Sequence, residues 1–213
     1  DYAITSSGGG VFARDGTMLF AAEMAPERAQ AVAETVAAFG LTPELYIHGQ
    51  AYASGYQLDH MDEWGVNKKT QGYIRDTRIR IENFSAFLQE NLHRIEGMDV
   101  LMAPSAVAPA LRLALGQLEG LAVTSSSPHY VDVNTAGVTK ASGLRHLGAI
   151  LGIQAGEMMA FGDAENDLPM LRYAGIGVAM ANAVPELLEA ADYVTASNDA
   201  DGIAAALRHF NLI

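Results

Sequence analysis

Strand-like and helical segments alternate regularly from residue 138 to the end of this sequence, and this alternation constrains the fold more than any other feature. The helical patterns fall over 139–152, 166–175, 184–191 and 201–210. The strand-like runs fall over 157–161, 176–180 and 192–195, and short loops join the two kinds of segment. Strands that run in the same direction must be linked by a crossover, usually a helix. The pattern therefore predicts a parallel sheet wrapped by helices.

Residues 24–125 lack this regularity and mix helices with strands without a strict repeat. Helices are expected over 26–40, 81–95 and 107–119, and strands over 44–49, 98–105 and 121–126. A further short strand is expected at 130–133, and residues 51–80 show no clear pattern. We therefore expect an α/β chain in which a mixed region precedes the regular C-terminal part.

The composition is that of a globular protein with a strong acidic excess. Half of the 213 residues are hydrophobic, and the formal net charge is -12. A surface this acidic argues against binding to a nucleic-acid backbone or to anionic membranes. The sequence holds no Cys and no apolar stretch of the roughly 18 residues that would indicate a membrane span. We expect a cytoplasmic protein with neither kind of partner.

The stretch VFARDGTMLF, residues 11–20, allows two interpretations. An apolar run leading into Asp-Gly-Thr resembles the phosphate-accepting loop of aspartate-dependent phosphatases, but Ala13 stands where that loop has its nucleophilic Asp. Asp-Gly between two apolar segments is also the strongest short signal for a β-hairpin. The residues favour a hairpin that turns at Asp15-Gly16.

The stretch AFGDAENDLPML, residues 160–171, carries the clearest chemical signal. Asp163 directly follows a predicted buried strand, and Asp167 lies one helical turn further on. Ligands bind at the carboxyl ends of strands in open α/β sheets, and a small set of oxygen ligands suits Mg²⁺. Acidic residues at the start of a helix can also be simple caps, but the whole pattern favours a metal site.

Lys140, in GVTKASGL, falls in the first turn of a predicted helix beside the expected cap Thr139. A cation is unfavourable there, because the N-terminus of a helix already carries a positive partial charge. A bound anion such as phosphate would remove this conflict. The alternative is an ordinary solvated lysine, and the nearby acidic cluster favours the phosphate.

Five of the thirteen basic residues fall in KKTQGYIRDTRIR, residues 68–80. This segment could be a strand or loop that faces an anion. We favour an exposed strand whose arginines partly balance Asp59, Asp62 and Glu63.

The segments GVTKASGLRHL (137–147) and MAFGDAENDLPMLRYAGIGVAMANAVPELLEAADYVTASNDADGIAAAL (159–207) closely resemble the haloacid dehalogenase superfamily. Within it they are similar to the Cof-type sugar-phosphatase-like hydrolases with a large α/β cap. DYAITSSGGGVF (1–12) resembles a segment of the same proteins, usually ITSNGA followed by a hairpin. The resemblance implies a Rossmannoid parallel-sheet core, built from 1–23 and 126–213, and an inserted α+β cap over 24–125.

The same resemblance implies covalent phosphoryl transfer through an aspartyl-phosphate, with Mg²⁺ as the cofactor. At the matching positions, Asp163 would ligate Mg²⁺ directly. Asp167 would ligate it through water or would orient Lys140. Lys140 would contact both the phosphate and the nucleophile.

Three further residues are implied as contacts of the phosphate or substrate. Asn166 would donate a hydrogen bond to the phosphate. Asn198, in SNDADG, is a second candidate at the same rim, although it could be only a turn residue. Ser7 stands where the family usually has an Asn that faces the substrate.

In this family the hairpin follows the nucleophile loop, so the real Asp-x-Asp-Gly-Thr strand would precede Asp1. The core is thus expected to be incomplete at its N-terminus. Loss of such a nucleophile reduces turnover by a factor of about a million, so we expect the 213-residue chain alone to be inactive. An N-terminal fragment or a second chain would complete the sheet, between the strands at 2–6 and 157–161.

The leading hypothesis is a Mg²⁺-dependent phosphatase of small phosphorylated metabolites, above all sugar phosphates. P-type ATPases share the Gly-Asp-x-x-Asn-Asp-x-Pro pattern but need membrane helices. A non-enzymatic alternative is an inactive truncated remnant, or a module that binds a ligand or a partner.

Overall fold

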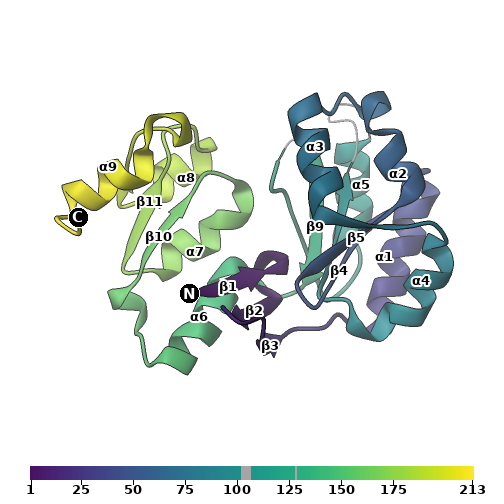
Figure 1. The fold of residues 1–213 in the computed structure, drawn as a ribbon, viewed down its shortest axis with the longest axis horizontal. Coiled ribbons are helices and arrows are strands. Elements are labelled where there is room, and N and C mark those ends of the chain that lie inside the picture. The colour runs from purple at the N-terminus through teal and green to yellow at the C-terminus, as the bar shows by residue number, and fades with distance from the viewer. Residues whose placement is uncertain (102–106, 128) are drawn as a thin grey trace. The chain divides into compact units, whose positions relative to one another are not determined.

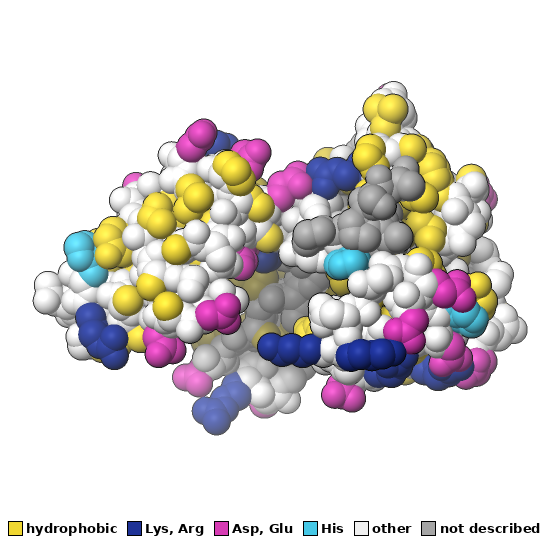
Figure 2. Space-filling model, turned by 90° about the horizontal axis from the view of Figure 1, so that it is seen from above, with side chains coloured by type: hydrophobic (Ala, Val, Ile, Leu, Met, Phe, Trp, Pro, Cys, Tyr) yellow, Lys and Arg dark blue, Asp and Glu magenta, His cyan; other side chains and the backbone are white. Residues whose placement is uncertain are grey.

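The structure is a computed structural model that describes residues 1–101, 107–127 and 129–213. Two compact units follow one another along the chain, Asp1–Val138 and Thr139–Ile213 (Figure 1). Within the described residues, no helix combines the length and the apolar character that crossing a membrane requires. Acidic and basic side chains are interspersed on the face of the molecule that Figure 2 shows.

The first unit begins with an antiparallel hairpin sheet in the order β1-β2-β3, with bounds Tyr2–Thr5, Gly10–Ala13 and Met18–Ala21. The turn that joins β2 to β3 includes Asp15, whose Oδ1 accepts a hydrogen bond of 2.9 Å from the amide of Thr17. Gly16 adopts a φ of 85°, which glycine reaches without a steric penalty. The predicted hairpin at Asp15-Gly16 is confirmed.

A six-stranded mixed sheet forms the larger part of the first unit. Its order is β6-β5-β4-β7-β9-β8, and only the β5–β6 pair is parallel. In chain order, the bounds of β4 to β9 are Glu44–Ile47, Gln50–Ser54, Arg78–Ile81, Gly97–Leu101, Leu121–Thr124 and Tyr130–Thr135. The C-terminal part of the strand predicted over 98–105 lies outside the described residues.

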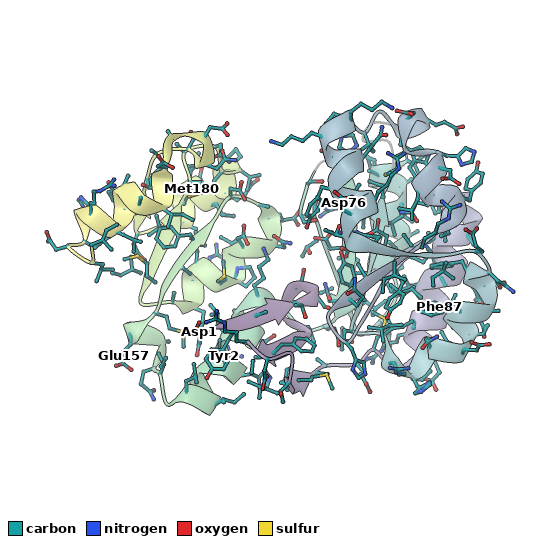
Figure 3. The ribbon with its side chains drawn as sticks, in the orientation of Figure 1. Asp1, Tyr2, Asp76, Phe87, Glu157 and Met180 are labelled. Atoms are coloured by element: carbon teal, nitrogen blue, oxygen red, sulfur yellow. The ribbon has the colours of Figure 1, made fainter. Side chains whose placement is uncertain are left out.

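One face of this sheet is covered by three helices, α1 (Pro26–Ala38), α4 (Phe84–Asn91) and α5 (Ala108–Gly116). Alternate strand residues point to this face, because side chains alternate across a strand. They bury a continuous apolar core with the helices, whose sheet members are Leu45, Ile47, Met98, Val100, Val131 and Val133. Phe87 of α4 (Figure 3) packs its ring 4.9 Å from that of Tyr52.

The region that gave no clear pattern contains two further helices, α2 (Gly55–Asp59) and α3 (Lys68–Thr77). The expectation of a basic strand over 68–80 was therefore wrong for its first ten residues, and only β6 is a strand. Asn67 caps α3 by accepting a hydrogen bond from the amide of Thr70. The buried residues Gln71 and Ile74 lie three apart, so they share one face of the helix. The cap residue Asn67 and the helical spacing of Gln71 and Ile74 could both have been recognised in the sequence.

The border predicted between residues 125 and 126 falls inside the six-stranded sheet, because β8 pairs with β9. Residues 130–135 thus belong to the first unit. Sequence patterns could not reveal this, because the apolar residues of β9 would suit either sheet. The first unit also includes residues 1–23. Their grouping with the C-terminal part into one core stays a prediction.

The second unit has the predicted parallel sheet, in the order β10-β11-β12. Its strands are Met159–Gly162, Ile176–Ala179 and Tyr193–Val194, and its helices α6 to α9 are Lys140–Leu151, Leu168–Tyr173, Pro185–Ala190 and Gly202–His209. Strand and helix alternate along the chain as the sequence predicted. In this sheet β10 is an edge strand.

Candidate active site

The carboxyl end of β10 brings two aspartates together, as the sequence predicted. Asp163 directly follows the last strand residue, Gly162, and is exposed, whereas Asp167 is only 4% exposed. Asp167 Oδ2 accepts hydrogen bonds from the amides of Asp163 at 2.9 Å and Ala164 at 3.0 Å. These bonds fold the loop tightly around the end of the strand.

Gly162 makes this tight loop sterically feasible. A Cβ atom at this position would lie 2.4 Å from the Cβ of Asp167 and 2.9 Å from its Oδ2. Such distances are far below van der Waals contact, so any larger residue would displace the carboxylate. The absence of a side chain at Gly162 therefore allows the carboxylate of Asp167 to lie against the end of the strand.

Lys140 donates a hydrogen bond from Nζ to Asp167 Oδ1, and the two form an ion pair. Lys140 opens α6, and Thr139 caps this helix in a capping box with Ser142. The carboxylate of Asp167 thus supplies the negative charge that a cation at a helix N-terminus requires. This contact removes the conflict from which a bound anion was inferred, so Lys140 alone no longer argues for phosphate.

Two asparagines from later loops join the same cluster. Asn182 Nδ2 donates to Asp163 Oδ2 at 2.9 Å, and Asn182 Oδ1 accepts from the amide of Asn198 at 3.0 Å. Sequence reasoning named Asn198 but missed Asn182. The missed signal was its position just after β11, because the carboxyl ends of adjacent parallel strands meet at one edge of the sheet.

The other two predicted residues lie in different settings. Asn166 is 7% exposed and lies in the short 3-10 turn Glu165–Asp167. Ser7 belongs to the first unit, in the loop between β1 and β2, where its φ is 50°. The proposed contacts of both residues with a substrate stay predictions.

The donor set suits a Mg²⁺ ion that keeps most of its waters, since such sites use only one or two carboxylates. Asp163 offers an exposed carboxylate that accepts a hydrogen bond from Asn182 Nδ2, while the amide oxygen of Asn182 is engaged by the amide of Asn198. Both oxygens of Asp167 are already engaged by protein groups. The geometry therefore favours Asp163 as the metal ligand and Asp167 as the residue that orients Lys140. Across residues 1–101, 107–127 and 129–213, no cluster of three or more Asp, Glu or His could hold a metal by itself.

Comparison with known proteins gives a consistent picture of similarity. A family model described as haloacid dehalogenase-like hydrolase matches residues 1–207. The 5-amino-6-(5-phospho-D-ribitylamino)uracil phosphatase YcsE of Bacillus subtilis is 45% identical over 92 residues, which are 43% of this chain and 37% of that protein. A phosphoglycolate phosphatase of Methanothermobacter thermautotrophicus is 49% identical over 73 residues, or 34% of this chain and 33% of that protein. The matches thus span about a third of these relatives.

Solved structures resemble the chain over nearly its whole length. A sugar phosphatase of haloacid dehalogenase subclass IIB superposes with a TM-score of 0.79 at 25% identity, covering 100% of this chain and 76% of that one. A haloacid dehalogenase-like hydrolase from B. subtilis gives a TM-score of 0.83 at 22% identity, covering 98% and 79% of the two chains. The second similarity concerns the fold alone.

Proposed function

Because the chain belongs to the haloacid dehalogenase-like hydrolases, we propose that it acts as a Mg²⁺-dependent phosphatase of small phosphorylated metabolites, above all sugar phosphates. The observation that carries this proposal is the cluster at the end of β10, where Asp167 holds Lys140 beside the exposed Asp163. The phosphatase names of similar proteins support it.

Each residue of the cluster has a proposed role. Lys140 places its ammonium group against the phosphoryl oxygens, and Asp167 fixes its position. Asp163 would hold Mg²⁺, which supplies positive charge to the phosphoryl group. Asn166 and Asn198 donate hydrogen bonds to the phosphate.

The reaction also needs a nucleophile and a contact to the substrate. Ser7 is the proposed substrate contact. We assign the nucleophilic aspartate to none of the 213 residues. The 213-residue chain alone is therefore expected to lack turnover, and the phosphatase activity is proposed for the whole protein.

The proposed substrate is small and phosphorylated, and the proposed location is the cytoplasm, without nucleic-acid or membrane partners. A strand from outside residues 1–213, in the same protein or a second chain, is proposed to pair with the open edge of β10. The alternative function is an inactive remnant or a binding module, which a lack of turnover by the whole protein would favour.

The test is hydrolysis of p-nitrophenyl phosphate by the whole protein, with Mg²⁺ and with a chelator. We expect Asp163→Asn to reduce kcat/KM by about a hundredfold or more. Glu189→Gln is the matched control, because it removes an exposed carboxylate on α8. Titration of Mg²⁺ followed by NMR adds a readout that does not require activity. Normal turnover by Asp163→Asn would refute the assignment.

A further inference from the structure

The loop between β1 and β2 has a backbone conformation that its side chains oppose. Ser6, Ser7 and Gly8 follow one another with φ values of 50°, 50° and 104°. Only glycine reaches such values easily, because in other residues the Cβ atom crowds the following carbonyl oxygen. Two consecutive serines in this conformation are strained, and such strain persists only where the surrounding structure holds the backbone in place.

The carboxylate of Glu96 contacts this loop and a second left-handed turn. Its Oε2 accepts a hydrogen bond of 2.8 Å from Ser6 Oγ. The same oxygen accepts a bond of 3.1 Å from the amide of Gly49, in the turn between β4 and β5. The φ values in that turn are 52° at His48 and 69° at Gly49. One carboxylate oxygen thus joins two strained turns that lie far apart in the sequence.

Glu96 is itself firmly placed. It directly precedes β7, and its amide donates a hydrogen bond of 2.8 Å to the carbonyl oxygen of Tyr46 in β4. A Cβ atom at Gly10 would lie 3.2 Å from Glu96 Oε2, and one at Gly9 would lie 3.1 Å from the carbonyl oxygen of Glu96. These two glycines therefore let the hairpin lie closely against Glu96, so that the carboxylate reaches the loop.

The conformation of the loop bears on the proposed site, because Ser7 is the proposed contact to the substrate. Ser6, Ser7 and Gly49 line a cavity of about 540 Å³ in the first unit. This volume is in the range of cavities that hold small organic molecules. Glu96 is bonded to two of these lining residues but is only 1% exposed. A change at Glu96 therefore reaches a ligand in the cavity through the residues that Glu96 holds.

We propose that Glu96 is a positioning residue, which keeps the Ser6–Ser7 loop left-handed and so places Ser7 for contact with the substrate. The inference rests on the proposed function, in which Ser7 is that contact. Without the bond to Glu96, the two serines relax toward negative φ, and this rotation of the backbone moves the Ser7 side chain. The bond requires an acceptor oxygen, which a glutamine at this position retains.

The conformation of the loop is measured by NMR of the whole protein, which does not require activity. Scalar couplings and carbon chemical shifts report φ at Ser6 and Ser7. We expect Glu96→Ala and Ser6→Ala to shift both residues toward negative φ, and Glu96→Gln to keep them left-handed. Glu90→Ala is the matched control, because it removes an exposed carboxylate on α4. A loop that stays left-handed in Ser6→Ala would overturn the proposal even if Glu96→Ala does not fold.

The effect on the substrate is measured as KM and kcat of the whole protein with Mg²⁺, using p-nitrophenyl phosphate and D-glucose 6-phosphate. We expect Glu96→Ala to raise KM by about tenfold, a typical value for the loss of one hydrogen bond to the substrate. The change in kcat should be small, because a contact made equally in the ground state and the transition state appears in KM alone. Glu96→Gln should restore KM.

A double variant separates positioning from a merely structural role. Ser7→Ala should raise KM by a similar factor, and Glu96→Ala should add little to it, because both changes remove the same contact. Effects that multiply would show that Glu96 acts independently of Ser7 and would overturn the proposal.

The failure of this inference and the failure of the proposed function give different results. Absence of turnover of either compound by the unaltered whole protein would refute the phosphatase, and with it the substrate role of Ser7. Unchanged φ values in the alanine variants at Glu96 and Ser6 would refute the role of Glu96, whatever the activity.

Discussion

Gly162 is the single residue on which the geometry of the candidate active site depends most. In Gly162→Ala the new methyl group would collide with Asp167, which must move away from the amides it accepts and from Lys140. We expect a loss of about 1–3 kcal/mol in unfolding free energy, together with loss of the proposed activity. Urea denaturation measures the first effect. Gly156→Ala is the control, because its Cβ would meet nothing within 4 Å.

Asp99 gives a prediction about pH. Its folded-state pKa is raised, chiefly by burial, so the folded protein holds the proton more tightly than the unfolded chain does. The stability that the Asp99 carboxyl contributes is fully present below its unfolded-state pKa of about 3.9, and it falls as the pH rises toward the pKa of this carboxyl in the folded state. Glu44, Asp132, Tyr46 and Arg78 face this carboxyl and set the folded value.

Asp99→Asn should remove part of this pH dependence and melt at a higher temperature than the unaltered chain above pH 6. Thermal unfolding across pH 4 to 8 measures the slope. An unchanged slope would show that the carboxyl is ionised in the folded state. A second variant, Asp76→Asn, corrects for the change in net charge, because Asp76 is exposed.

At the scale of the element, α3 contains a glycine that weakens it. Gly72 lies inside the helix, and a Cβ there would meet nothing within 4 Å. Gly72→Ala should therefore raise the unfolding free energy by about 0.5–1 kcal/mol. Gly65→Ala is the opposite control, since a φ of 69° makes a side chain unfavourable there. Chemical denaturation of the two variants should show shifts of opposite sign.

Most elements of the second unit could be predicted, because each strand is a short apolar run and each helix has a recognisable start. Examples are Lys140, which follows the helix cap Thr139, and Asp163, which follows an apolar strand. α3 was missed because Arg75, Arg78 and Arg80 suggested an alternating strand, whereas the buried positions Gln71 and Ile74 follow helical spacing. Asn182 was missed because it follows β11, whereas Asp163, to which it donates a hydrogen bond, follows β10.

At the scale of the whole molecule, the open edge of β10 leads to the next prediction. The backbone groups on this edge have no partner strand among the described residues. If a strand from outside residues 1–213 pairs there, the edge amides of Met159–Gly162 should exchange hydrogen more slowly in the whole protein than in the 213-residue chain. Equal exchange rates in both would contradict the pairing. The amides of β11 serve as the internal reference, because β11 is paired on both sides.

The sequence by itself determined the local features: the parallel α/β pattern after residue 138, the Asp15-Gly16 hairpin, and the placement of Asp163 and Asp167 at a strand end. These follow from periodicity and from turn and cap residues, which act over a few positions. Only the tertiary structure decided which sheet β9 joins, that Asp167 pairs with Lys140, and that Glu44, Asp99 and Asp132 lie in one row. The last two of these join residues 27 to 55 positions apart in the sequence, as Lys140–Asp167 and Glu44–Asp99 do. They depend on strand register and packing, which no local pattern encodes.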